Sequence, residues 1–297
     1  MRRDRAAAAP DLTLDAADAY CRFLTNRHYE NFSVASRFVD GERRADLSRI
    51  YAFCRSTDDL GDESPNGSAE PRLTLWRDEV EAMFAGIPPV HPVLQALART
   101  IERRRIPAAP FLNLIEANLM DQHVKTYAGW EELERYCTLS AAPVGRMVLR
   151  VFEVTDAACE RLSDDVCIGL QLANHAQDVS RDAVLGRTYL LQSDLARGGV
   201  EAGVRGLVER ARVLLQSGRV LERRIEATAL RMQLALYRMG GEAICDAIER
   251  IGYRTDRKRP SVTAAVKVSL VARALGAALR RTHDGAASVS ITPHTTK

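Results

Sequence analysis

The sequence predicts an all-α fold. Apolar residues recur at helical spacing over most of the chain, and no stretch shows the period-two alternation of a half-buried strand. No repeat of fixed period and no long polar linker divides the 297 residues. We therefore expect residues 1–297 to form a single domain of roughly ten helices.

Composition limits the class of protein. With 46% apolar and 27% charged residues, the chain has the make-up of a soluble globular protein, and its net charge of +3 does not favour nucleic-acid binding. Two short basic clusters, 103–105 and 257–259, are interpreted as solvated helix ends. The six cysteines form no Cys-x-x-Cys pair, which favours reduced thiols over disulfides or a zinc site. No signal peptide or spanning segment is found, so we expect a cytoplasmic protein.

The N-terminal half is expected to contain five main helices. Residues 1–12 are interpreted as a disordered leader, and residues 31–38 as a short helix or turn. The Ser-Pro-Asn-Gly-Ser turn at 64–68 separates two helices, and Pro107 fits the first turn of another. The helices expected here span 14–28, 46–62, 69–84, 93–105 and 107–125.

The C-terminal half is expected to continue the helical pattern. Residues 130–152 form one or two helices with a break at 141–145, and residues 186–191 form a loop. Gly218 is the candidate joint in the stretch 204–239, which forms one long or two shorter helices. The tail from Thr282 is expected to be disordered. The other helices expected here span 156–182, 241–251 and 262–281.

Acidic residues recur at a four-residue step in two of these helices. Asn174, Asp178 and Asp182 fall on one helical face, and Asp58 and Asp62 show the same step. A single pair of this kind is usually a solvated surface. Here both rows lie in apolar helices, where burying carboxylates without a cation is costly. Oxygen ligands suit Mg²⁺ bound together with substrate phosphates, so the sequence predicts a magnesium–diphosphate site.

A di-iron carboxylate bundle is a weaker alternative for these acids. Such bundles require Glu-x-x-His motifs on their helices, and no such motif accompanies the two acidic rows.

Two longer segments carry a family resemblance. Tyr51-Ala52-Phe53-Cys54-Arg55-Ser56-Thr57-Asp58-Asp59 and Asn174-x-x-Gln177-Asp178-Val179-x-Arg181-Asp182 resemble the two signature segments of the squalene/phytoene synthase family. Further matching segments follow in the same order: Tyr136-Cys137, Ala142-Pro143-Val144-Gly145-Arg146 and Arg187-x-Tyr189. The resemblance extends from about residue 31 to 260. Segments 31–37, 142–146 and 251–253 are most similar to bacterial hydroxysqualene synthases of the hopanoid pathway.

The resemblance implies an isoprenoid synthase-type helical bundle around a central cavity, with Mg²⁺ as cofactor. The implied metal ligands are Asp58, Asp62, Asn174, Asp178 and Asp182. The implied substrate-binding residues are Ser33, Arg37, Tyr51, Arg55, Arg181, Tyr189 and Tyr253, and Tyr51 and Tyr189 join the four aspartates as the implied catalytic residues. For Arg55, a local salt bridge with the acids of its own helix is the alternative.

The implied chemistry explains these residue types. Ionising an allylic diphosphate leaves a carbocation and a diphosphate, whose charge Mg²⁺ and arginine neutralise. The leading expectation is conversion of presqualene diphosphate and water to hydroxysqualene. Alternatives are head-to-head condensation of two farnesyl diphosphates, giving presqualene diphosphate or squalene, or of two geranylgeranyl diphosphates, giving phytoene. An inactive helical binding or assembly module is the alternative from another class.

One departure from the family pattern bears on the product, and one apolar segment bears on partners. His175 and Ala176 stand where many relatives carry bulky aromatic residues, so the cavity volume can differ. The segment 262–281 is apolar with basic flanks, and it forms either a helix packed on the bundle or an interfacial helix at the inner membrane surface. Expected partners are the prenyl diphosphate substrate and other enzymes of the same pathway.

Overall fold

The computed structural model describes residues 14–27, 39–64 and 67–284, and these residues confirm the all-α prediction. The one β feature in these ranges is an isolated bridge between Tyr127 and Leu191. The helices are α1 (Leu14–Arg27), α2 (Gly41–Asp62), α3 (Ala69–Phe84), α4 (Pro92–Arg104), α5 (Ala109–His123), α6 (Trp130–Ser140), α7 (Ala142–Val151), α8 (Ala157–Gln177), α9 (Val179–Val184), α10 (Gln192–Arg224), α11 (Thr228–Arg250) and α12 (Ala264–Asp284).

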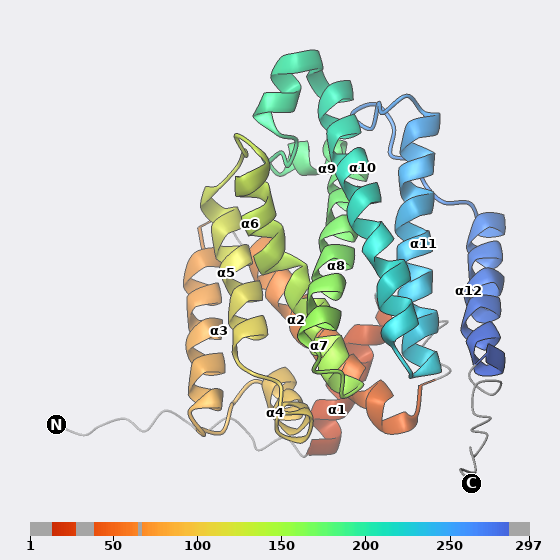
Figure 1. The fold of residues 1–297 in the computed structure, drawn as a ribbon. Helices are drawn as coiled ribbons and strands as arrows, with labels where there is room; N and C mark the ends of the chain where they lie inside the picture. Colours follow the sequence, from red (N-terminus) through yellow and green to blue (C-terminus); the bar gives the residue numbers. More distant parts are fainter. Residues whose placement is uncertain (1–13, 28–38, 65–66, 285–297) are drawn as a thin grey trace, which may run out of the picture.

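Helix α8 runs through the middle of the bundle (Figure 1). It packs against α10 and α11 on one side and against α6 and α7 on the other, while α2 and α5 complete the second side. Helix α12 lies on the outer side of α11 (Figure 1). This arrangement places the two helices that carry the acidic rows, α2 and α8, inside the bundle rather than on its surface.

Capping residues set where these two helices begin. The Asp40 carboxylate accepts a hydrogen bond from the Arg43 backbone at 2.9 Å, so α2 begins five residues before its predicted start at Asp46. The Asp156 carboxylate accepts from the backbone of Ala158 and Cys159, and α8 begins there as predicted. Both caps satisfy backbone donors that a helix start leaves unpaired.

The predicted joint at Gly218 is wrong. Helix α10 passes through Gly218 and ends at Arg224, and α11 then continues unbroken through Gly241. At Gly218 an added Cβ would lie only 3.0 Å from the Arg238 side chain, and at Gly241 only 2.8 Å from Leu170. These glycines therefore permit close helix packing instead of breaking the helices. The backbone departs from helical angles at Gly198 and Gly199.

The predicted continuous helix over 156–182 is also wrong. Helix α8 ends at Gln177, and Asp178 serves as the cap between α8 and the short α9. The predicted disordered tail is partly outside the described residues, but α12 extends to Asp284, three residues beyond its expected end at Arg281. The segment 31–38 lies outside the described residues.

An aromatic cluster fixes α2 against its neighbours. The Phe53 ring stacks on Trp76 at 5.7 Å and meets Phe111 edge-on at 5.1 Å, and all three side chains are buried. The Trp76 indole nitrogen donates to the Thr57 hydroxyl at 3.0 Å. These contacts fix the turn of α2 that precedes Asp58.

The basic cluster at 103–105 is only partly the solvated helix end that was predicted, because Arg103 and Arg105 are exposed whereas Arg104 is not. Asp46 is fully buried and accepts hydrogen bonds from Arg49, Arg103 and Arg104. The Arg104 side chain is only 6% exposed. Buried charges require such partners, so this cluster ties α2 to α4.

Cysteine chemistry and membrane crossing can be stated for the described residues. All six cysteines, which lie within the described ranges, are free thiols, as predicted. In the described part of the chain, no helix is both long and apolar enough to cross a membrane.

Candidate functional site

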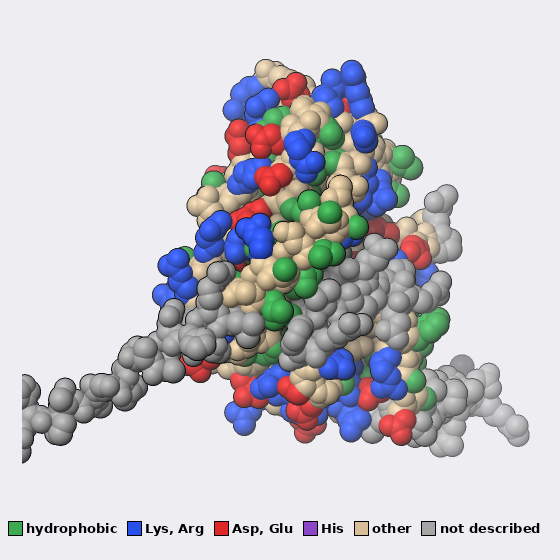
Figure 2. Space-filling view, turned by 90° about the vertical axis from the view of Figure 1, so that its right-hand side faces the viewer, with side chains coloured by type: hydrophobic (Ala, Val, Ile, Leu, Met, Phe, Trp, Pro, Cys, Tyr) green, Lys and Arg blue, Asp and Glu red, His purple; other side chains and the backbone are tan. Residues whose placement is uncertain are grey.

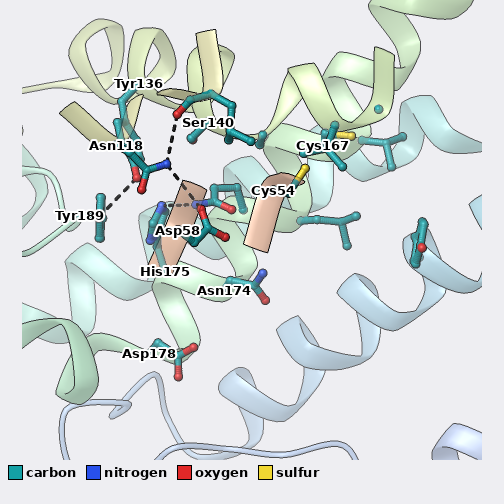
Figure 3. Close-up of a pocket in the computed structure, with 18 of the residues that line it drawn as sticks. Cys54, Asp58, Asn118, Tyr136, Ser140, Cys167, Asn174, His175, Asp178 and Tyr189 are labelled. Atoms are coloured by element: carbon teal, nitrogen blue, oxygen red, sulfur yellow. Dashed lines mark hydrogen bonds between the residues drawn. The ribbon is translucent and has the colours of Figure 1, made fainter. Parts of the chain in front are cut away.

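A cavity of about 600 Å³ lies between α2, α5 to α9 and α11 (Figure 3). Polar and charged residues gather on one part of its wall: Asp58, Asp62, Asn118, Asp121, Asn174, His175, Asp178, Arg181, Asp182 and Arg187. Apolar residues line much of the remainder: Leu114, Val144, Val148, Leu149, Val166, Leu170, Leu230 and Leu234. A cavity with this division suits a ligand with a polar head and a long hydrocarbon body, and an anionic head would require a cation beside the carboxylates.

The first acidic row ends helix α2. Asp58 and Asp62 both line the cavity, and the Asn118 amide on α5 lies 3.4 Å from the Asp58 carboxylate. Burial raises the pKa of the Asp58 carboxyl to about 7, against the lowering effect of the Asn118 hydrogen bond. A side chain at Gly61 would come within 2.6 Å of the Asn118 side-chain oxygen, so glycine here leaves room for Asn118 between α2 and α5.

The second acidic row spans the junction of α8 and α9. Asn174, Asp178 and Asp182 all line the cavity, although they belong to two helices rather than one. Burial, with a contribution from the Asp178 charge, raises the pKa of the Asp182 carboxyl to about 7. The structure therefore brings both predicted rows to the same cavity.

Arg259 is exposed, as the sequence analysis expected, but it also forms an ion pair with Asp178. Its guanidinium donates to both carboxylate oxygens of Asp178, and it reaches the Gln177 side-chain oxygen at 3.1 Å. The Gln177 amide in turn donates to the Pro260 carbonyl oxygen at 2.7 Å. The segment after α11 thus fixes the residue at which α8 ends.

Arg187 lies between the two rows. Its guanidinium is 2.6 Å from Asp62 and 3.3 Å from Asp121, and its side chain is only 11% exposed. Asp121 also accepts hydrogen bonds from the hydroxyls of Tyr136, at 2.7 Å, and Tyr189, at 3.0 Å. Burial raises the pKa of Asp121 against the effect of these partners.

Sequence reasoning missed Asp121 and gave Arg187 no individual role. A signal existed for each: Asp121 is an acid on an otherwise apolar helix face, and Arg187 belongs to the Arg187-x-Tyr189 motif. The loop that carries this motif is positioned by backbone pairing with the segment after α5. The Thr188 amide donates to the Lys125 carbonyl oxygen, and the Gln192 amide to that of Tyr127, each at 2.9 Å.

His175 is a cavity-wall residue, as expected. Its ring stacks on Tyr189 with 3.6 Å between ring centroids, and its Nε2 lies 3.1 Å from the Gln171 amide nitrogen. Burial, with a contribution from the Arg187 charge, lowers the pKa of His175 to about 3, so the ring is neutral. Ala176 is buried but does not line the cavity.

Other predicted site residues lie elsewhere. Tyr51 and Tyr253 are not among the residues that line the cavity, and the Tyr253 ring packs under the Arg205 guanidinium at 4.3 Å. Arg55 also does not line it. It pairs with Asp59 at 2.5 Å and Glu63 at 2.8 Å, which is the local salt-bridge alternative.

The remaining predicted substrate-binding residues fall into two groups. Arg181 lines the cavity, is 66% exposed and lies 3.8 Å from Asp178, and Tyr189 lines it from the loop after α9. Ser33 and Arg37 lie outside the described residues.

The donor set fits magnesium. Within the described residues, no three or more His, Cys, Asp or Glu side chains converge into a ready-made metal cage. What the cavity offers is carboxylate and amide oxygens from several helices, and burial raises the pKa values of Asp58 and Asp182 among them. Such a set suits a hard ion that completes its shell with water and substrate oxygens, as Mg²⁺ does.

Comparison with known proteins supplies the family. Residues 25–266 match the squalene/phytoene synthase family model. A hydroxysqualene synthase from Sinorhizobium fredii is 33% identical over 222 residues, covering 70% of this chain and 75% of the relative. A presqualene diphosphate synthase from Rhodopseudomonas palustris is 31% identical over 174 residues, covering 58% of this chain and 62% of the relative.

Solved structures of related proteins have the same fold as this chain. The crystal structure of a squalene synthase from Alicyclobacillus acidocaldarius has a TM-score of 0.76 and 44% identity, covering 81% of this chain and 95% of its own. A dehydrosqualene synthase has a TM-score of 0.79 at 22% identity, covering 90% of this chain and 98% of its own, which shows the shared fold. Both acidic rows and the Arg187 loop lie inside the matched residues. The chain therefore belongs to the squalene/phytoene synthase family, whose members are enzymes that act on prenyl diphosphates.

Proposed function

We propose that the protein converts presqualene diphosphate and water to hydroxysqualene and diphosphate, with Mg²⁺ bound between the substrate and the two acidic rows. The observation that carries this proposal is one cavity that has acidic rows on one part of its wall and apolar residues on much of the rest. Similarity to the Sinorhizobium fredii hydroxysqualene synthase over 70% of the chain supports the choice of reaction.

The polar wall would bind the diphosphate head. Asp58, Asp62, Asn174, Asp178 and Asp182 would hold Mg²⁺, which as a Lewis acid neutralises the charge that builds on the leaving diphosphate. Arg187 adds a fixed positive charge. Because Asp62 and Asp121 hold its guanidinium, that charge is in place before substrate binds and costs no reorganisation.

The apolar wall would hold the hydrocarbon and exclude bulk water. Leucine and valine side chains from α5, α7, α8 and α11 offer a carbocation no base and no stray nucleophile. The overall reaction replaces a diphosphate group by a hydroxyl group and transfers no electrons, so it needs no reductant.

Condensation of two prenyl diphosphates is the second candidate. It is favoured by the similarity to the presqualene diphosphate synthase, and to a maize chloroplastic phytoene synthase that is 35% identical over 63% of this chain and 45% of its own length. A condensing enzyme consumes two prenyl diphosphate molecules. The proposed reaction consumes one diphosphate molecule in which the two prenyl units are already joined.

Product analysis distinguishes these candidates. Purified protein is incubated with presqualene, farnesyl or geranylgeranyl diphosphate, each with Mg²⁺, and the products are identified by mass spectrometry. We expect hydroxysqualene from presqualene diphosphate. Presqualene diphosphate or squalene from farnesyl diphosphate alone, or phytoene from geranylgeranyl diphosphate, would favour condensation, and no diphosphate release from any substrate would favour an inactive binding module.

We also propose that α12 makes a peripheral membrane contact through its outer face. Leu270 and Ala274 pack against α11, whereas Val268 is 70% exposed, Val266 37% and Leu275 36%. Figure 2 looks onto the side of the molecule where α12 lies and shows exposed hydrophobic side chains among charged ones. A greasy substrate favours an enzyme that rests on lipid.

Flotation with anionic liposomes tests the membrane contact. We expect the wild-type protein to float with the vesicles and Val268→Asp to float less, at unchanged thermal stability. Equal flotation of both proteins, or none of either, would contradict the contact at this face.

A further inference from the structure

Asp178, at the end of α8 (Figure 3), is held by the segment 251–263, which joins α11 to α12. The Arg259 Nε donates to one carboxylate oxygen of Asp178, and its Nη2 donates to the other at 3.3 Å. The same Nη2 reaches the side-chain oxygen of Gln177 at 3.1 Å. Both oxygens of a predicted metal ligand are therefore paired with a cation that belongs to the chain itself.

The two arginines that pair with the acidic rows differ in how firmly they are held. Arg187 lies between Asp62 and Asp121, which come from two helices, and its side chain is only 11% exposed. The Arg259 side chain is 36% exposed, and it follows two exposed basic residues on the segment 251–263. Arg259 can therefore leave its carboxylate without burying its own charge, whereas Arg187 cannot.

Mg²⁺ and the Arg259 guanidinium require the same oxygens of Asp178. A bidentate guanidinium occupies a lone pair on each of the two carboxylate oxygens. Mg²⁺ demands near-ideal octahedral geometry and loses its water ligands reluctantly. Two cations at one carboxylate also repel each other. A metal ion therefore binds Asp178 best when Arg259 has withdrawn.

We propose that Arg259 competes with Mg²⁺ for Asp178 and releases that carboxylate when the metal binds. This inference rests on the proposed function, in which Asp178 is a magnesium ligand. In the metal-free protein, Arg259 neutralises Asp178 and ties the segment 251–263 to the end of α8. In this role Arg259 acts through Asp178 and not on the substrate.

The release of Arg259 loosens the segment that carries it. Among the described residues, three hydrogen bonds from Arg259 join residues 257–260 to the end of α8, and a fourth runs from the Gln177 amide to the Pro260 carbonyl oxygen at 2.7 Å. When the three bonds of Arg259 are lost, only the fourth remains. We therefore expect the backbone amides around residue 259 to exchange hydrogen faster once the metal has bound.

The competition is tested by metal binding in the absence of substrate. The dissociation constant of Mg²⁺ is measured by isothermal titration calorimetry on purified, chelator-treated wild-type protein and on three variants. Arg259→Gln removes the competing charge, and Arg259→Lys keeps the charge without the bidentate geometry. Arg257→Gln is the matched control, because it removes the same charge from an exposed residue of the same segment.

We expect Arg259→Gln to bind Mg²⁺ about fivefold more tightly than wild type, the scale of one partly exposed ion pair. Arg259→Lys should fall between these two proteins. Arg257→Gln should stay within about twofold of wild type, because solvent and salt screen an exposed charge. Unchanged or weaker Mg²⁺ binding by Arg259→Gln, or an equal gain in Arg257→Gln, would overturn the competition.

Hydrogen exchange tests the release and does not depend on activity. The backbone amides of residues 255–263 are followed by mass spectrometry with and without saturating Mg²⁺. We expect the metal to speed their exchange in the wild-type protein and to change nothing in Arg259→Gln, where exchange is fast from the start. Unchanged or slower exchange in the metal-bound wild type would overturn the release. Failure of all four proteins to bind Mg²⁺ would overturn the magnesium site of the proposed function itself, and this inference with it.

Discussion

The Arg187 guanidinium lies 2.6 Å from the Asp62 carboxylate, and this ion pair joins the loop after α9 to the last turn of α2. The same guanidinium is 3.3 Å from Asp121 on α5. One arginine from the second half of the chain therefore neutralises acids from two helices of the first half. The carboxylates that face the cavity are held near a cation even before any metal binds.

Replacing Arg187 with glutamine should destabilise the fold. The variant leaves Asp121, whose side chain is only 9% exposed, without its charged partner, and removing one member of a buried pair costs about 3 kcal/mol. Urea denaturation at neutral pH measures this change in the free energy of unfolding. Arg205→Gln is the control, because Arg205 is 47% exposed in its pair with Glu201 and should change stability much less. Equal effects of the two substitutions would contradict the role given to Arg187.

Replacing Asp178 with alanine should abolish turnover without unfolding the protein. Asp178 lines the cavity at the end of α8, outside the apolar core, so its loss should leave the helical circular dichroism intact. We expect diphosphate release to fall on the order of 10²- to 10³-fold, the scale of losing one major electrostatic contact in a transition state. Asp78→Ala, on the exposed face of α3, serves as the control. Activity retained in the Asp178 variant would exclude Asp178 as a ligand.

Replacing Asp58 with asparagine should stabilise the metal-free protein, and the gain should depend on pH. The folded protein holds the Asp58 proton up to a pKa of about 7, whereas the unfolded chain releases it at a pKa of about 4. The ionised carboxylate therefore weakens the fold as pH rises from about 4 through 7, and the penalty is complete above that range. Asparagine does not titrate, so its advantage is full at pH 8 and vanishes near pH 4.

Thermal unfolding of both proteins in a chelator, from pH 4 to pH 8, measures that advantage. A melting-temperature difference that does not change with pH would show that the Asp58 charge is not the cause. We expect the same variant to lose activity, because the Asp58 carboxylate lowers the stability of the fold but is needed for function.

The acidic rows could be predicted from the sequence because regular spacing survives folding. Asp58 and Asp62 on α2 and Asn174 and Asp178 at the end of α8 recur every four residues, and the structure brings them to one cavity. The break at Asp178 was not predictable in the same way. It places Asp182 on a separate helix, and it accompanies the pairing of Asp178 with Arg259, a contact between residues far apart in sequence.

The glycines of the C-terminal helices led to a wrong prediction of where these helices break. Gly218 and Gly241 weaken a helix considered alone, so the local pattern suggested a joint. Their neighbours explain the glycines instead: Arg238 and Leu170 approach so closely that an added side chain would have to displace them. Asp121 was missed for a related reason, because its partners come from α6 and the loop after α9 and are not visible in the local sequence.

The most direct test of the account is the Mg²⁺ dependence of diphosphate release from presqualene diphosphate by the purified, chelator-treated protein. Two acidic rows that act through a bound cation predict no release without metal, and release that rises and saturates as Mg²⁺ is added, with hydroxysqualene as the accompanying product. Undiminished release in the presence of excess chelator would contradict the central claim that Asp58, Asp62, Asn174, Asp178 and Asp182 work by holding magnesium against the diphosphate.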